Sequence, residues 1–292
     1  MTSLELPPGL RVGHWTDPVA RTGCTVVLFP AGTVAAAEVR GGAPASRELE
    51  LLHPERTVER IDAAVLSGGS AFGLASADGA MRWCAERGMG FATAAGPVPI
   101  VPALAIFDLL EGDGSVRPGA DAGYAACEAA TADAVELGRV GAGAGATLAK
   151  WRGRDHARPG GIGGAVVRNG DLHVVALVVV NAFGDILDGP DRDEVLPRVP
   201  PADQSAPEVA FGNTTVGVVV TNAALTKGEC LLMAQSGHDG MARALAPAHT
   251  TADGDALIAA ATGELTVGAV ELEAVRALAA VAVERAIRAG PG

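Results

Sequence analysis

Two nearly uninterrupted apolar runs constrain the fold more than any other feature of this sequence. They occupy residues 172–180 (LHVVALVVV) and 215–220 (TVGVVV). Both are rich in β-branched valine, which favours strands, and neither alternates polar with apolar residues. Strands of this kind are buried on both faces of a sheet. The sequence therefore predicts a layered architecture in which other elements cover the sheet on either side.

Further strand and helix signals alternate along the chain. Strands are expected at residues 24–29 and 63–66, and helices at about 71–87, 226–246 and 267–289. The composition is 49% hydrophobic but only 3% aromatic, so the core must be built from Ala, Val, Leu and Ile, which pack well between closely spaced layers. These signals predict a layered α/β fold. No linker or change of composition divides the 292 residues, so a single domain over 1–292 is expected.

Charge and composition exclude several classes of partner. A net charge of -12 and the lack of a basic stripe argue against nucleic acid and anionic membrane surfaces. The N-terminus lacks the pattern of a signal peptide, and the apolar run at 174–180 is too short to span a bilayer. We therefore expect a soluble, cytoplasmic protein.

No motif indicates a metal or a cofactor. The four cysteines are scattered among apolar neighbours, which predicts buried free thiols, and the six histidines show no metal-binding spacing. The SGGS turn at 67–70 lacks both the dinucleotide fingerprint and the lysine of a phosphate-binding loop. We interpret that turn as close packing of a helix against a strand.

A glycine-dense segment, residues 141–165, contains Lys150, one of only two lysines in the chain. Two interpretations are open. Lys150 is a solvated loop charge, or the glycines let the backbone approach a reacting group whose developing negative charge the ammonium stabilises.

Two hydroxyls stand where the second apolar run begins, in the sequence Asn213-Thr214-Thr215. A threonine hydroxyl needs a base to act as a nucleophile, and the α-amine of the same residue is one such base if the residue is N-terminal. For an internal threonine this requires self-cleavage: the hydroxyl attacks the preceding carbonyl, an ester forms by N-to-O acyl shift, and water releases the new N-terminus. A turn followed by an ordinary strand is the alternative, and periodicity does not distinguish Thr214 from Thr215.

A second cluster lies about forty residues later. Asp253 and Asp255 are two apart, so on an extended segment both carboxylates face the same way. A surface Asp-Gly-Asp turn is the alternative. Nearby, His238 and His249 are interpreted as structural, because adjacent residues on a helix do not face each other and His238 cannot pair with Asp239.

Seven segments together resemble the self-processing L-aminopeptidase/D-esterase family, which includes β-peptidyl aminopeptidases and nylon-oligomer hydrolases. The resemblance covers nearly the whole chain. The segments are VGHWTD (12–17), TGCTVVL (22–28), EVRGGAPASRE (38–48), LSGGSAFGLASADG (66–79), GAGAGATLAKW (141–151), GNTTVGVVVTNAALTK (212–227) and HDGMARAL to HTTADGD (238–255).

This resemblance implies an αββα fold like that of N-terminal-nucleophile hydrolases, with different connectivity. It also implies cleavage between Asn213 and Thr214 into chains 1–213 and 214–292 that stay associated. Thr214 would be the nucleophile and its freed amine the base. Asp253 and Asp255 match the acidic pair that orients the nucleophile in nylon-oligomer hydrolases.

Three further positions carry expectations from the family. Asn181 matches an asparagine near the nucleophile and is expected to be an oxyanion donor, and Lys150 matches a lysine of the glycine-rich loop. Phe107 stands where some members have an oxyanion tyrosine. Phenylalanine cannot donate a hydrogen bond, so we expect Phe107 to be a wall of the substrate pocket instead.

The resulting hypothesis is a cytoplasmic, homo-oligomeric, self-processing threonine hydrolase that needs no cofactor. Its expected substrate is a short peptide or amide with a free amino group, or an ester. Whether that is an α-peptide, a β-peptide, a small amide or an ω-amino oligomer stays open. Two alternatives remain: acyl transfer like that of ornithine acetyltransferases, and an uncleaved, non-catalytic binding protein.

Overall fold

The computed structural model describes residue 4 and residues 6–133, 135–187 and 212–291. Two five-stranded sheets face each other. The first contains, in spatial order, β1 (Arg11–Asp17), β2 (Thr22–Leu28), β5 (Ala63–Ser67), β8 (Ala103–Ala105) and β4 (Ala45–Arg47). The second contains β11 (Gly161–Asn169), β12 (Leu172–Asn181), β14 (Thr214–Ala224), β16 (Ala256–Thr266) and β3 (Val34–Val39).

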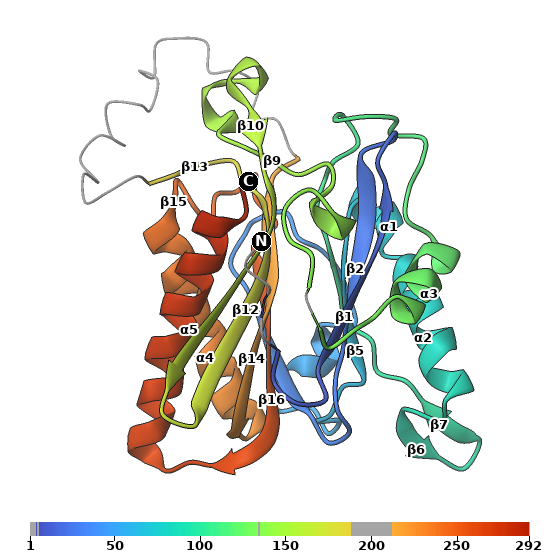
Figure 1. The fold of residues 1–292 in the computed structure, drawn as a ribbon, viewed down its shortest axis with the longest axis vertical. Coiled ribbons are helices and arrows are strands. Elements are labelled where there is room, and N and C mark those ends of the chain that lie inside the picture. Colours follow the sequence, from blue (N-terminus) through green and yellow to red (C-terminus); the bar gives the residue numbers. More distant parts are fainter. Residues whose placement is uncertain (1–3, 5, 134, 188–211, 292) are drawn as a thin grey trace.

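Helices cover the outer face of each sheet (Figure 1). The longer pair, α4 (Lys227–Ala244) and α5 (Ala269–Ala289), packs on the second sheet, and α2 (Ser76–Glu86) and α3 (Ala120–Glu128) pack on the first. The shorter elements are α1 (Ser70–Gly73), β6 (Phe91–Thr93), β7 (Gly96–Val98), β9 (Thr147–Leu148), β10 (Arg158–Pro159), β13 (Asp185–Ile186) and β15 (Leu245–Ala246). The layered αββα fold expected from the sequence is confirmed.

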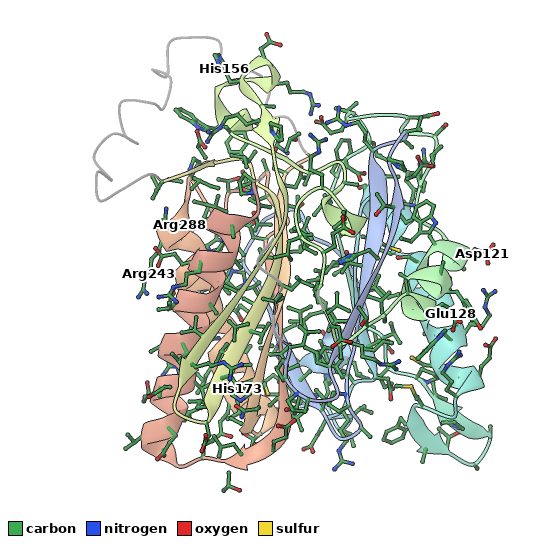
Figure 2. All side chains as sticks on the ribbon, viewed as in Figure 1. Asp121, Glu128, His156, His173, Arg243 and Arg288 are labelled. Atoms are coloured by element: carbon green, nitrogen blue, oxygen red, sulfur yellow. The ribbon has the colours of Figure 1, made fainter. Side chains whose placement is uncertain are left out.

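Three apolar layers hold these elements together. One lies between the two sheets, one between the second sheet and α4 and α5, and one between the first sheet and α2 and α3. Charged side chains lie on the outer faces of the helices. Figure 2 labels Arg243 on α4, Arg288 on α5, and Asp121 and Glu128 on α3. The burial of β12 and β14 on both faces explains their near-continuous valine content.

The central strands of the second sheet position one group of polar residues. β14 pairs with β12 in antiparallel register, with Thr214 opposite Asn181, and with β16 in parallel register. Val216, Val218 and Val220 face the core between the sheets, whereas Val219 faces the helices. Because strand side chains alternate, Thr214 faces the space between the sheets and Thr215 faces the helical layer.

One expected element is wrong. The continuous helix expected at residues 71–87 is interrupted after α1, and a second helix begins at Ser76. A Cβ on Gly73 would lie 1.8 Å from the carbonyl oxygen of Gly68, so the backbone there follows a close approach that periodicity does not reveal. The other expected helices and strands differ only at their ends.

The SGGS turn packs tightly. The Gly69 amide donates to Asp108 Oδ1 at 2.7 Å, and a Cβ on Gly68 would lie 2.1 Å from Asp108 Oδ2. The turn therefore packs closely, but against a carboxylate of the protein that lies outside the helices and strands, and these contacts do not test the expected packing of a helix against a strand.

The four cysteines are free and buried, as expected. Within the described part of the chain, none of the helices combines the length and apolar content needed to cross a membrane.

Candidate active site

The Asn213–Thr214 peptide bond lies where β14 begins. The Thr214 hydroxyl donates to the carbonyl oxygen of Asn213, which also accepts the Gly254 amide at 3.0 Å. Asn213 forms a parallel bridge with Asp253 that aligns the two segments. The carbonyl just before the threonine is thus held by one hydroxyl and one amide, the arrangement that polarises a carbonyl toward attack.

Gly254 fits this position because it has no side chain. A Cβ there would lie 2.8 Å from Thr214 Oγ1 and 2.8 Å from the Ala43 carbonyl oxygen. The Thr214 hydroxyl therefore lies directly against the backbone of the Asp-Gly-Asp segment. Sequence reasoning missed Gly254, although a glycine between two aspartates is the signal that could have revealed it.

Asp253 is almost completely buried, so the alternative of a surface Asp-Gly-Asp turn is wrong. Its carboxylate accepts the Phe183 amide at 3.1 Å, the Thr250 amide at 3.2 Å and the Thr250 hydroxyl at 2.5 Å. Burial, and then the negative charge of Asp255, raise the pKa of Asp253 to about 6. Asp253 therefore changes charge within reach of neutral pH.

Asp255 is equally buried but has different partners. Its Oδ1 accepts the Thr215 amide at 2.7 Å, and its Oδ2 accepts the His249 amide at 2.9 Å and lies 2.9 Å from His249 Nδ1. Asp255 therefore holds the backbone one residue past Thr214. The Thr215 hydroxyl itself is buried without a hydrogen-bond partner among the described residues.

Lys150 and Asn181 form the other side of the site. Lys150 Nζ donates to Asn181 Oδ1 at 2.9 Å and to the carbonyl oxygens of Asn181 and Gly212 at 3.1 and 3.2 Å. Asn181 Nδ2 donates to the carbonyl oxygens of Phe107 at 3.1 Å and Gly212 at 3.3 Å. Both side chains therefore bind the backbone immediately upstream of Asn213.

Lys150 is only 7% exposed, so the solvated-loop interpretation is wrong. Burial lowers the pKa of the Lys150 ammonium to about 7, an effect that the charge of Glu111 partly opposes. Glu111 in turn pairs with Arg154 at 2.6 Å. A lysine with this pKa can both donate and accept a proton near neutral pH.

Phe107 is partly buried, and its ring approaches Gly212, where a Cβ would lie 2.9 Å from Cδ1. The site residues expected from the sequence therefore gather around residues 212–215. In the described part of the chain no cluster of three or more His, Cys, Asp or Glu side chains is arranged to hold a metal ion.

Comparisons with known proteins give consistent matches. The sequence matches peptidase family S58 over residues 7–290. It is 44% identical over 295 aligned residues to an uncharacterized aminopeptidase of Mycobacterium tuberculosis, covering 91% of this chain and 83% of that protein. It is 33% identical over 279 residues to a 6-aminohexanoate-oligomer endohydrolase of Kocuria sp., covering 88% and 74%.

Solved structures with the same fold include a β-aminopeptidase of Burkholderia sp., with a TM-score of 0.74 and 26% identity over 97% of this chain and 84% of that one. An L-aminopeptidase D-Ala-esterase/amidase of Ochrobactrum anthropi, described as a variant of the Ntn hydrolase fold, has a TM-score of 0.73 and 17% identity, covering 98% and 84%. The latter likeness concerns the fold alone. The resemblance expected from the sequence motifs is confirmed.

Proposed function

The chain belongs to peptidase family S58, and from this membership and the contacts of Asn213 we propose that it is a self-processing hydrolase with Thr214 as nucleophile. The observation that carries the proposal is the pair of hydrogen bonds on the Asn213 carbonyl, one from the Thr214 hydroxyl and one from the Gly254 amide. The hydroxyl and the bond to be cut belong to adjacent residues in direct contact.

Self-cleavage begins when Thr214 Oγ1 attacks the Asn213 carbonyl carbon. The Gly254 amide stabilises the negative charge that develops on the oxygen. The C–N bond breaks, the nitrogen takes a proton and leaves as the Thr214 amine, and the acyl group passes to the hydroxyl oxygen. Water then hydrolyses this ester to a carboxyl group on Asn213 and restores the Thr214 hydroxyl. The threonine nitrogen is part of an amide before cleavage, so a side chain must take the hydroxyl proton. Two titratable groups lie beside this bond: Lys150, whose Nζ donates to the Gly212 carbonyl, and Asp253, which is bridged to Asn213. Their pKa values of about 7 and about 6 favour them for this role.

Turnover then uses the freed amine. An α-amine has a pKa of about 7.7–8.0, so it accepts the Thr214 hydroxyl proton as the oxygen attacks an amide or ester carbonyl. The acyl-threonine forms, the leaving amine or alcohol takes a proton, and water releases the acid. Departure of residues 212–213 from the site frees Lys150 Nζ and Asn181 Nδ2 from the Gly212 carbonyl, and both then serve as donors to the substrate.

The proposed substrate is a short peptide or amino-acid amide with a free amino group, cleaved as an aminopeptidase would cleave it. An ammonium group needs an anionic partner, which the acidic pair or another carboxylate of the pocket would supply. The Phe107 ring, which lies against Gly212, forms a wall of the pocket for the acyl group. The proposed working form is a homo-oligomer of the cleaved unit in the cytoplasm.

Intact mass under denaturing conditions tests this proposal, with Thr214→Ala as the control. Cleavage before Thr214 of the 29.2 kDa chain yields pieces of roughly 21 and 8 kDa, in proportion to their lengths, the smaller beginning at Thr214. We expect these pieces and hydrolysis of aminoacyl-nitroanilides only in the wild type. An uncut wild-type chain without amidase activity would instead support a binding protein, and acetyl transfer from acetylornithine to glutamate would support an acyltransferase.

A further inference from the structure

His249 has a backbone conformation that a histidine rarely adopts. Its φ is +58°, in the left-handed region that costs most residues free energy. Such strain persists where the surroundings impose it, and it concentrates at functional sites. At His249 the conformation brings the amide and ring Nδ1 of one residue onto a single oxygen, Asp255 Oδ2, each at 2.9 Å.

The other oxygen of this carboxylate points to the proposed nucleophile's strand. Asp255 Oδ1 accepts the Thr215 amide at 2.7 Å, and Thr215 follows Thr214 directly. Thr215 faces the helical layer, and so does His249: its ring stacks edge to face on His238 of α4, with the centroids 4.8 Å apart. The chain of contacts from His238 through His249 and Asp255 to Thr215 therefore supports β14 from the side opposite the Thr214 hydroxyl.

We propose that His249 is a positioning residue: its ring Nδ1–H binds Oδ2 of Asp255 and holds that side chain in place, and Asp255 in turn holds the backbone that carries Thr214. This proposal rests on the proposed function of Thr214. A carboxylate only accepts hydrogen bonds, so Nδ1 must carry the proton. The ring of His249 contacts Asp255 through Nδ1 and lies 3.5 Å from the His238 carbonyl oxygen through Nε2.

Two substitutions separate the hydrogen bond from the backbone conformation. His249→Gly and His249→Asn both tolerate positive φ, and both remove the ring. Only asparagine retains an N–H donor near the position of Nδ1. We expect His249→Gly to lower kcat/KM for an aminoacyl-nitroanilide by about tenfold or more, because a misplaced nucleophile loses rate steeply.

His249→Asn is expected to keep kcat/KM within about threefold of the wild type, because its amide N–H can replace the ring donor. Equal activity of the Gly and Asn variants would overturn the proposal, because the donor would then have no effect. Thermal unfolding of both variants checks that they are equally folded.

A readout independent of turnover separates this proposal from the proposed function. In the Thr214→Ala chain, the ¹⁵N spectrum of the His249 ring is expected to report Nδ1 as the protonated nitrogen. A ring protonated only at Nε2 would overturn the role of His249, whatever the activity. Amidase activity that persists in Thr214→Ala would overturn the proposed nucleophile, while the ring spectrum would still decide the contact with Asp255.

Discussion

The ammonium group of Lys150 is buried, so water hydrates it poorly. Three protein oxygens, on Asn181 and Gly212, replace the hydration of its ammonium. Burial nevertheless lowers its pKa to about 7, so part of the population is neutral at physiological pH. A partly protonated lysine suits proton transfer during self-cleavage and electrostatic stabilisation during turnover. Its burial also reduces the stability of the folded chain.

The burial of Lys150 predicts that the free energy of unfolding depends on pH. The folded-state pKa of Lys150 lies below its unfolded value of 10.5, so between about pH 7 and pH 10 the unfolded chain binds more protons. The free energy of unfolding, relative to Lys150→Met, is therefore expected to rise with pH by at most about 1.4 kcal/mol per unit across this window. Urea denaturation at several pH values, with both chains in the Thr214→Ala background, measures the difference. A difference that stays flat would contradict a lowered pKa of the buried Lys150.

At the level of elements, the site depends on how the beginnings of β14 and β16 meet. The parallel pairing of these strands continues upstream as the bridge between Asn213 and Asp253, which places the Gly254 amide against the Asn213 carbonyl. The pairing register of β14 and β16 therefore holds the Gly254 amide against the Asn213 carbonyl. The geometry proposed for self-cleavage is thus a property of the sheet as much as of individual side chains.

Gly254→Ala tests this dependence. The added Cβ would lie 2.8 Å from Thr214 Oγ1 and from a backbone oxygen, so either the hydroxyl or the amide must move. We expect self-cleavage to slow by at least about tenfold, measured by intact mass after timed expression. Gly228→Ala, at the start of α4 in open space, is the matched control and should be cut at the wild-type rate. Complete cleavage of a folded Gly254→Ala chain would rule out a close fit at this position.

The sequence predicted the elements better than their spatial relations. The valine runs of β12 and β14 identified strands buried on both faces, because burial leaves a local pattern. The interruption near Gly73 was missed because it arises from contact with the Gly68 carbonyl, which periodicity does not record. The contacts of His249, which was interpreted only as structural, and of Gly254, which was missed, could not be predicted for a similar reason: they depend on a positive φ and on a backbone amide.

For the whole molecule, the proposed cleavage would divide a sheet through its middle. Residues 214–292 supply β14 and β16, which lie between β12 and β3 of residues 1–213. They also supply α4 and α5, which cover the outer face of that sheet. Residues 1–213 keep the first sheet, but neither piece retains the second sheet complete, and each would expose apolar edges and faces on its own.

The two proposed pieces are therefore expected to remain together. Size-exclusion chromatography of the wild type in native buffer should give one peak that contains both pieces and elutes with uncut Thr214→Ala, whereas guanidinium chloride should separate the pieces. Residues 1–213 expressed alone should be insoluble, because β12 and β3 lose their partners. Pieces that elute apart in native buffer would contradict the interleaved sheet, since the hydrogen bonds on both sides of β14 and β16 would have to break together.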